Sequence, residues 1–154
     1  TRYGIRVDEY SLHTDGAGAG EYRGGSGCVR TYRSMNDNQS FTASFGRNKW
    51  PVWGAAGGKD GSCNYFQFHD ADGNVSEPMG IVARRVMNKN DVVRMVTATG
   101  GGYGDPMKRD PAKVAMDVKN EYITLEQAKA DYGVIVDPES FDVVGLTPER
   151  EAAK

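Results

Sequence analysis

Two cationic side chains stand beside glycine-rich turns, where they could bind an anionic group. Arg23 directly precedes Gly24 and Gly25, and Lys59 follows a glycine pair. A guanidinium or ammonium group binds carboxylate or phosphate, and Arg can do so through two parallel hydrogen bonds. A third run offers backbone amides that could do the same, at Gly100, Gly101 and Gly102. These residues are the predicted anion or substrate-cavity contacts; the alternative is that the two cations are solvated or paired with another subunit.

The glycine runs match neither of the two common phosphate-binding motifs. A P-loop requires a glycine where this chain has Trp53 and a hydroxyl residue where it has Asp60. The dinucleotide motif requires a third glycine where the first run has Glu21 and the last run has Asp105. The glycines therefore predict tight turns with positive φ, bulges or the close approach of another chain. No residue of this chain is nominated as catalytic.

No metal site is predicted either. Residues 70–74 resemble the start of a calcium loop, but Val75 stands where that loop requires glycine and Ile81 where it requires glutamate. The Asp-Gly pair in this stretch instead predicts a hairpin turn. The spacing of the remaining candidate ligands selects no metal; these are His13, His69, Cys28 and Cys63.

Short segments of strand-forming residues come first along the chain. They predict β-strands over residues 4–12, 28–34, 64–69 and 92–98. In the first segment the alternation of apolar residues slips by one position, which predicts a bulge near Asp8 or Glu9.

The period then changes to that of helices. Asp110 is placed to cap a helix that starts at Pro111, and apolar residues recur every four positions from Val114 to Tyr122. A second helix is predicted from the capping box of Thr124 and Gln127 to a left-handed cap at Gly133. A return strand over 134–137 and a frayed helical tail follow.

These elements predict an α+β fold, a mainly antiparallel β domain with two short C-terminal helices. We expect one domain over 1–154, β-rich over 1–107, with a helical hairpin and return strand over 108–137 and a tail over 138–154. The 154 residues carry a net charge of −2, too weak to favour nucleic acid or a membrane surface as a partner. Two cysteines and the lack of a signal peptide or apolar span predict a cytoplasmic protein.

The motifs, read in order, resemble the C-terminal region of the hydantoinase B family. The matching stretches are DGAGAGEYRGGSGCVR from residue 15, GGKDGSCNYF from residue 57, MNKNDVVRMVTATGGGYGDPMKRDPAKVAMDV from residue 87 and ITLEQAKADYGVIVD from residue 123. The resemblance runs from about residue 7 to residue 137 and is most specific over 97–117. It departs from the family at DGAGAG, where the usual pattern is closer to DSGGAG.

This family comprises B subunits of ATP-dependent hydantoinases and 5-oxoprolinases and the matching subunits of acetone and acetophenone carboxylases. The resemblance implies a small accessory subunit that completes a hydantoinase B-like unit, in a hetero-oligomer resembling acetophenone carboxylase. Hydantoinase A-like and hydantoinase B-like large subunits would be its partners. ATP and a divalent metal would be bound there and no cofactor by this chain, which would be part of a ligase that joins activated ketone and bicarbonate. Sealing a cavity from water would serve such a reaction, because hydrolysis competes with transfer.

Two alternatives stay open. The same domain could serve an ATP-dependent hydantoinase, oxoprolinase or lactamase, in which a cyclic amide is opened. A different class of function is a non-enzymatic β-rich binding module, which predicts a well-behaved monomer when the chain is expressed alone.

Overall fold

The computed structural model describes residues 3–152, and the predicted α+β class is confirmed. Its contacts gather in two compact units. The first comprises residues 3–13, 27–51 and 63–98, and the second comprises residues 14–26, 52–62 and 99–152. Each unit thus combines three separate stretches of the chain.

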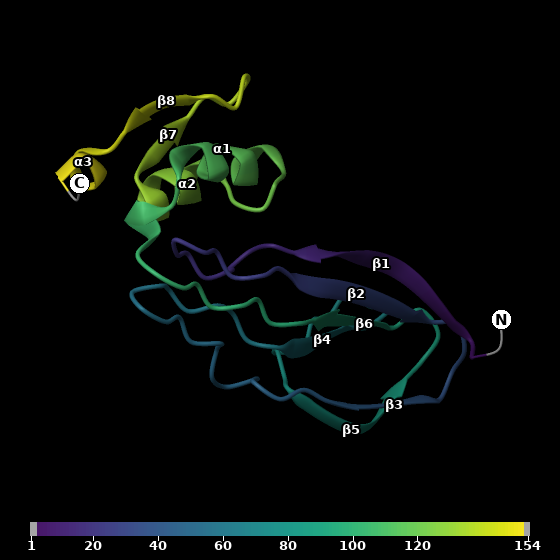
Figure 1. Ribbon diagram of the computed structural model, residues 1–154. Coiled ribbons are helices and arrows are strands. Elements are labelled where there is room, and N and C mark those ends of the chain that lie inside the picture. The colour runs from purple at the N-terminus through teal and green to yellow at the C-terminus, as the bar shows by residue number, and fades with distance from the viewer. Residues whose placement is uncertain (1–2, 153–154) are drawn as a thin grey trace. The chain divides into compact units, whose positions relative to one another are not determined.

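The first unit is built from antiparallel strands only. A four-stranded sheet has the order β1-β2-β6-β4, and two further strands pair as β3-β5 (Figure 1). The strands are β1 (Ile5–His13), β2 (Gly27–Ser34), β3 (Gln39–Ser44), β4 (Tyr65–His69), β5 (Ile81–Met87) and β6 (Val92–Val96). The predicted strands at 4–12, 28–34, 64–69 and 92–98 are confirmed, the last of them two residues shorter. The predicted turn at 70–74 is also present, with the Asp70 carboxylate accepting from the backbone N–H of Asn74 at 2.8 Å.

The predicted bulge in β1 is confirmed, because the register with β2 shifts between Val7 and Glu9. Residues directly opposite in an antiparallel pair point to the same face of the sheet. The apolar residues of β1 lie opposite alternate residues of β2, so they all share one face: Ile5 lies opposite Ser34, Val7 opposite Tyr32, Tyr10 opposite Arg30 and Leu12 opposite Cys28. The extra residue of the bulge thus places the apolar residues before and after it on one face of the sheet, although their alternation in the sequence slips by one position.

Aromatic packing between the four-stranded sheet and the β3-β5 pair forms the core of the first unit. The ring of Phe41 meets Phe66 and Phe68 edge-on, with centroids 5.7 and 5.5 Å apart. Phe45 stacks on Phe66 at 4.2 Å. Such pairs each add about 0.5–1.5 kcal/mol beyond the burial of their area. The sequence did not predict β3 or β5, and in β5 the positive φ of Arg84 (50°) interrupts the alternation.

The second unit carries the helices. After a 3-10 turn (Pro106–Lys108), α1 (Pro111–Lys119) begins at the predicted cap, where the Asp110 carboxylate accepts from the N–H of Ala112 at 2.9 Å. Val114 and Val118 are buried as their spacing predicts. The α2 helix (Leu125–Tyr132) ends at Gly133, which has the predicted left-handed conformation with φ of 62°.

The capping box of α2 supports a stability prediction. We expect Thr124→Ala to lower the free energy of unfolding by about 1 kcal/mol, because the Thr124 hydroxyl accepts from the N–H of Gln127 at 3.1 Å. Thr124→Ser keeps the capping hydroxyl and is expected to change the free energy of unfolding by no more than about 0.3 kcal/mol in either direction. Denaturant unfolding of both variants checks this, and an equal loss in the two would show that the cap is not the cause.

The described residues after α2 are more regular than the predicted frayed tail. The return strand β7 (Val134–Val136) pairs antiparallel with β8 (Val143–Leu146), and α3 (Pro148–Ala152) follows. Arg150 of α3 is buried, and its guanidinium donates to the carbonyl oxygens of Tyr132 and Arg109. A third helix is thereby fixed to the second unit. Within residues 3–152, no helix has the length and apolar content needed to cross a membrane.

Candidate functional site

Three segments of the second unit lie backbone against backbone, and they contain every predicted contact residue. We call residues 14–26, 52–62 and 99–104 the glycine cluster. Its segments are joined by main-chain hydrogen bonds: the N–H of Gly18 donates to Gly100 at 2.9 Å, that of Lys59 to Ala19 at 2.7 Å, and that of Gly102 to Lys59 at 2.9 Å. The three glycine runs, far apart in sequence, therefore form one structure.

The absence of side chains is what permits this approach. A Cβ atom on Gly24 would lie 2.0 Å from the carbonyl oxygen of Gly100, and one on Gly58 would lie 2.2 Å from that of Gly102. Real Cβ atoms do not approach backbone oxygens so closely, so both positions require glycine for steric reasons. The close backbone approach seen here joins segments of this same chain, and the predicted approach of another chain stays a prediction.

The hydroxyl groups of Thr99 and Ser62 join the segments of the cluster through hydrogen bonds. The buried Thr99 hydroxyl donates to the carbonyl of Gly16 at 2.7 Å and accepts from the N–H of Ser62 at 2.8 Å. In return, the Ser62 hydroxyl accepts from the N–H of Thr99 at 2.9 Å. One residue from each segment of the cluster takes part, so this exchange fixes their relative position.

Arg23 connects the cluster to α1. Its Nη1 donates to the carbonyl of Gly24 at 2.9 Å, and its Nε lies 3.3 Å from a carboxylate oxygen of Asp117. The guanidinium also lies over the ring of Tyr122, 4.7 Å from the centroid. In the structure Arg23 is thus held on three sides by its own chain.

The Asp117 carboxylate is the centre of a buried ionic group. The same oxygen accepts from Nη2 of Arg109 at 2.8 Å, and Arg109 also donates to the carbonyl of Glu21 at 2.9 Å. The side chains of Asp117, Arg109 and Arg23 are only 10–14% exposed. Two further buried polar atoms, Nε of Arg109 and the hydroxyl of Tyr132, have no hydrogen-bond partner among residues 3–152. Burial raises the pKa of the Tyr132 hydroxyl above its usual value.

Lys59 and the triple glycine are also engaged within the chain. The ammonium group of Lys59 pairs with Asp131 at 2.5 Å, and its side chain is 55% exposed. The amide of Gly100 donates to the carbonyl of Gly25 at 2.8 Å, and that of Gly102 donates to Lys59. The structure therefore brings the predicted contact residues into one cluster and gives most of them internal partners. Their role as anion contacts stays a prediction.

Sequence reasoning missed the residues that hold the cluster together. Asp117 falls on the apolar face of α1, three residues after Val114 and one before Val118, and a carboxylate on such a face signals a buried partner. That signal was available in the sequence. The pairing of Thr99 with Ser62 had no local signal, since 37 positions separate them. Within residues 3–152, no three His, Cys, Asp or Glu side chains are grouped to hold a metal ion.

Comparison with known proteins matches residues 1–106 to the Hydantoinase B/oxoprolinase family. The chain belongs to this family. Among its hydantoinase B relatives, a Pseudomonas sp. (strain NS671) protein named as the B-type polypeptide of a D-/L-hydantoinase is 33% identical over 92% of this chain. The beta chain of caprolactamase from Pseudomonas jessenii is 30% identical over 88%. The chain covers 24% of the length of each.

Two solved structures share the fold. The ATP-dependent caprolactamase from Pseudomonas jessenii matches 98% of this chain with a TM-score of 0.78 and 29% identity. An acetone carboxylase in its nucleotide-free form matches 97% with a TM-score of 0.77 and 20% identity. This chain covers 26% and 24% of those two chains. The chain thus spans about a quarter of the length of the relatives it matches, among them the beta subunit of a caprolactamase.

Proposed function

We propose that this chain forms part of the hydantoinase B-type unit of an ATP-dependent enzyme that opens a cyclic amide. The observation that carries this proposal is sequence identity. The chain is 30–33% identical to relatives named for a hydantoin and a lactam, against 20% to the acetone carboxylase. We therefore place cyclic-amide hydrolysis first and ketone carboxylation second, which reverses the order expected from the sequence.

Ketone carboxylation is the second candidate. The acetone carboxylase and the caprolactamase match this chain with nearly equal TM-scores, 0.77 and 0.78, so the fold favours neither reaction. An acetone- or acetophenone-type ligase, in which activated ketone and bicarbonate are joined, therefore remains compatible with the fold.

The part we propose for this chain is structural support of the unit. Arg23 and Lys59 have carboxylate partners in the chain, and the amides of Gly100 and Gly102 have carbonyl partners. A cluster so fully bonded is rigid, and a rigid wall can hold substrate-bearing segments in place and exclude water. ATP, a divalent metal and the reacting groups would be bound by hydantoinase A-like and hydantoinase B-like partner polypeptides.

Product analysis of the assembled enzyme distinguishes the two reactions. The chain would be purified together with its hydantoinase A- and B-type partners and given ATP and Mg²⁺ with caprolactam, hydantoin or 5-oxoproline. Parallel samples would receive acetone or acetophenone with labelled bicarbonate. We expect ATP-dependent release of an open-chain acid from a cyclic amide and no label in a β-keto acid. Label fixed in a β-keto acid, with the cyclic amides left intact, would replace cyclic-amide hydrolysis by carboxylation. Formation of neither product by an intact complex would contradict both candidate reactions.

A further inference from the structure

The β1 strand presents an apolar face that the other described residues of the first unit leave uncovered. Ile5, Val7, Tyr10 and Leu12 share that face because of the bulge, and each is 50–69% exposed. The opposite face is polar, and there Arg6 and Arg33 pair with Asp8 at 2.7 Å. A strand with one apolar and one polar face normally packs the apolar one against a core. The apolar residues of β1 are thus aligned as in a strand that packs against a core, but no described residue of the first unit packs over them.

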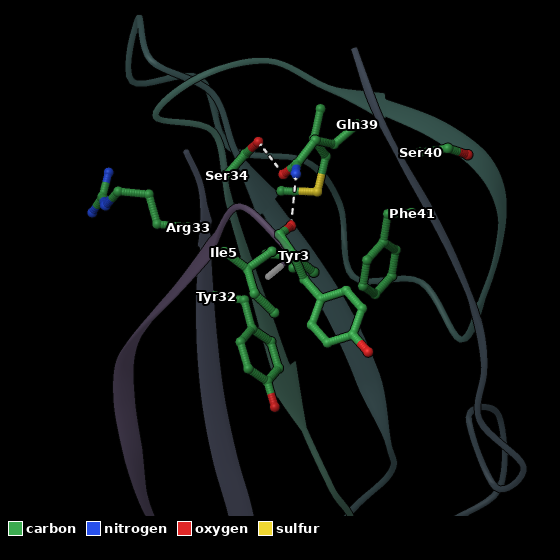
Figure 2. A pocket seen from close by; sticks show the side chains of 10 residues that line it. Tyr3, Ile5, Tyr32, Arg33, Ser34, Gln39, Ser40 and Phe41 are labelled. Carbon is green, nitrogen blue, oxygen red and sulfur yellow. Dashed lines mark hydrogen bonds between the residues drawn. The ribbon is translucent and has the colours of Figure 1, made fainter. Parts of the chain in front are cut away.

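The β3-β5 pair covers only part of the four-stranded sheet, because it has two strands and the sheet has four. The β3-β5 pair contacts the β4 side of the sheet, where Phe41 packs on Phe66 and Phe68. Between β3 and the β1-β2 pair lies an open groove of about 410 Å³. Figure 2 shows the side chains of Ile5, Tyr32 and Phe41 around it. The groove adjoins the exposed apolar face of β1 and extends from it toward the core of the first unit.

The groove is suited to apolar side chains. Two of its polar side chains are bonded within the chain: the Ser34 hydroxyl donates to Oε1 of Gln39 at 2.6 Å, and Nε2 of Gln39 donates to the carbonyl of Tyr3 at 3.0 Å (Figure 2). Apolar atoms of Met87 and Val93 line it as well. A side chain that enters the groove is therefore stabilised by burying apolar surface, and it leaves few polar groups of the groove without hydrogen bonds.

Tyr10 is held in position for such a contact. The guanidinium of Arg30 lies 4.6 Å from the centre of the Tyr10 ring, and its Nη2 donates to the hydroxyl at 3.0 Å. Tyr and Arg are among the residues most often found as energetic anchors of protein interfaces. A side chain fixed in advance loses less entropy when a partner binds.

We propose that an extended segment of the hydantoinase B-type polypeptide, from the part that this chain does not cover, packs over β1 and fills this groove. This chain covers 24% of each of the two relatives, so most of the polypeptide lies outside the matched region in both and can supply such a segment. An extended segment matches the alternation of β1 and offers an apolar side chain at every second residue. The inference rests on the proposed role of this chain within a hydantoinase B-type unit.

Site-specific photocrosslinking in the assembled enzyme tests this contact. Benzoylphenylalanine would be placed at Val7 or Tyr10 on the apolar face, with Arg6 on the polar face of the same strand as the matched control. After irradiation, mass spectrometry would identify the attached segment. We expect crosslinks from Val7 and Tyr10 to the uncovered part of the hydantoinase B-type polypeptide, at a yield at least about tenfold above that from Arg6.

Other outcomes overturn the proposal. Crosslinks only to a second copy of this chain or to the hydantoinase A-type polypeptide would assign the face to another partner. No crosslink from an intact, purified complex would show that the face stays open. As a second measurement, Val7→Asp is expected to reduce the recovery of the hydantoinase B-type polypeptide with this chain at least about tenfold, and Arg6→Asp to leave it unchanged. Both readouts report contact and not turnover, so they are independent of which reaction the enzyme catalyses.

Discussion

Replacing Gly24 by Ala is expected to destabilise the protein by about 3 kcal/mol or more, the upper end for overpacking a tight site. The new methyl group would lie 2.0 Å from the carbonyl oxygen of Gly100 and 2.5 Å from its carbon. Backbone atoms cannot move aside as the end of a flexible side chain can, so the segments of the glycine cluster must separate. Thermal unfolding should show a fall in Tm of roughly 6–12 °C for a chain of this length.

The neighbouring Gly25 is the matched control. A Cβ atom there would meet nothing within 4 Å, and the residue is exposed. Gly25→Ala is therefore expected to change the free energy of unfolding by no more than about 1 kcal/mol, in either direction. If the two variants lost stability equally, the close approach of Gly24 to Gly100 would not be what requires glycine.

Replacing Asp117 by Ala should cost about 3–5 kcal/mol, the range found when one member of a buried ion pair is removed. The carboxylate is the acceptor for both Arg23 and Arg109, whose side chains are only 14% and 13% exposed. Without it, two guanidinium groups would remain desolvated and close together. Denaturant unfolding measures the loss.

Asp131 provides the comparison for that variant. It is also a helical aspartate in an ion pair, but its partner Lys59 is 55% exposed. Solvent screening makes such pairs weak, so Asp131→Ala is expected to change stability by at most about 1 kcal/mol. A large loss at Asp131 with a small one at Asp117 would contradict the assignment of Asp117 as the central acceptor.

The elements with local signals could be predicted from the sequence. Asp110 and Pro111 define the start of α1, Thr124 and Gly133 define the limits of α2, and the slipped alternation locates the bulge of β1. Each signal lies within a few residues of the feature it predicts. The β3-β5 pair could not be found in this way, because its alternation is broken at Arg84 and its partners are about 40 residues apart.

The sequence named residues that the structure brings into one cluster, but it did not predict their bonding. The glycine runs predicted the close approach of another chain, whereas here segments of the same chain approach one another, and the cations Arg23 and Lys59 lie in that cluster. Their partners Asp117 and Asp131 are 94 and 72 positions away in the chain. Only the folded structure determines such distant pairing, which is why the sequence left the two cations free to contact a ligand.

A cluster made of backbone has an evolutionary consequence. Gly24 and Gly58 cannot accept even a methyl group without disturbing a neighbouring segment of the backbone. Mutation therefore cannot introduce new side-chain chemistry at these two positions without damage to the fold. Solved structures of a caprolactamase and of an acetone carboxylase nevertheless share this fold, with TM-scores of 0.78 and 0.77. In this chain, new side-chain chemistry must then arise at positions other than these two glycines, which form a fixed frame around them.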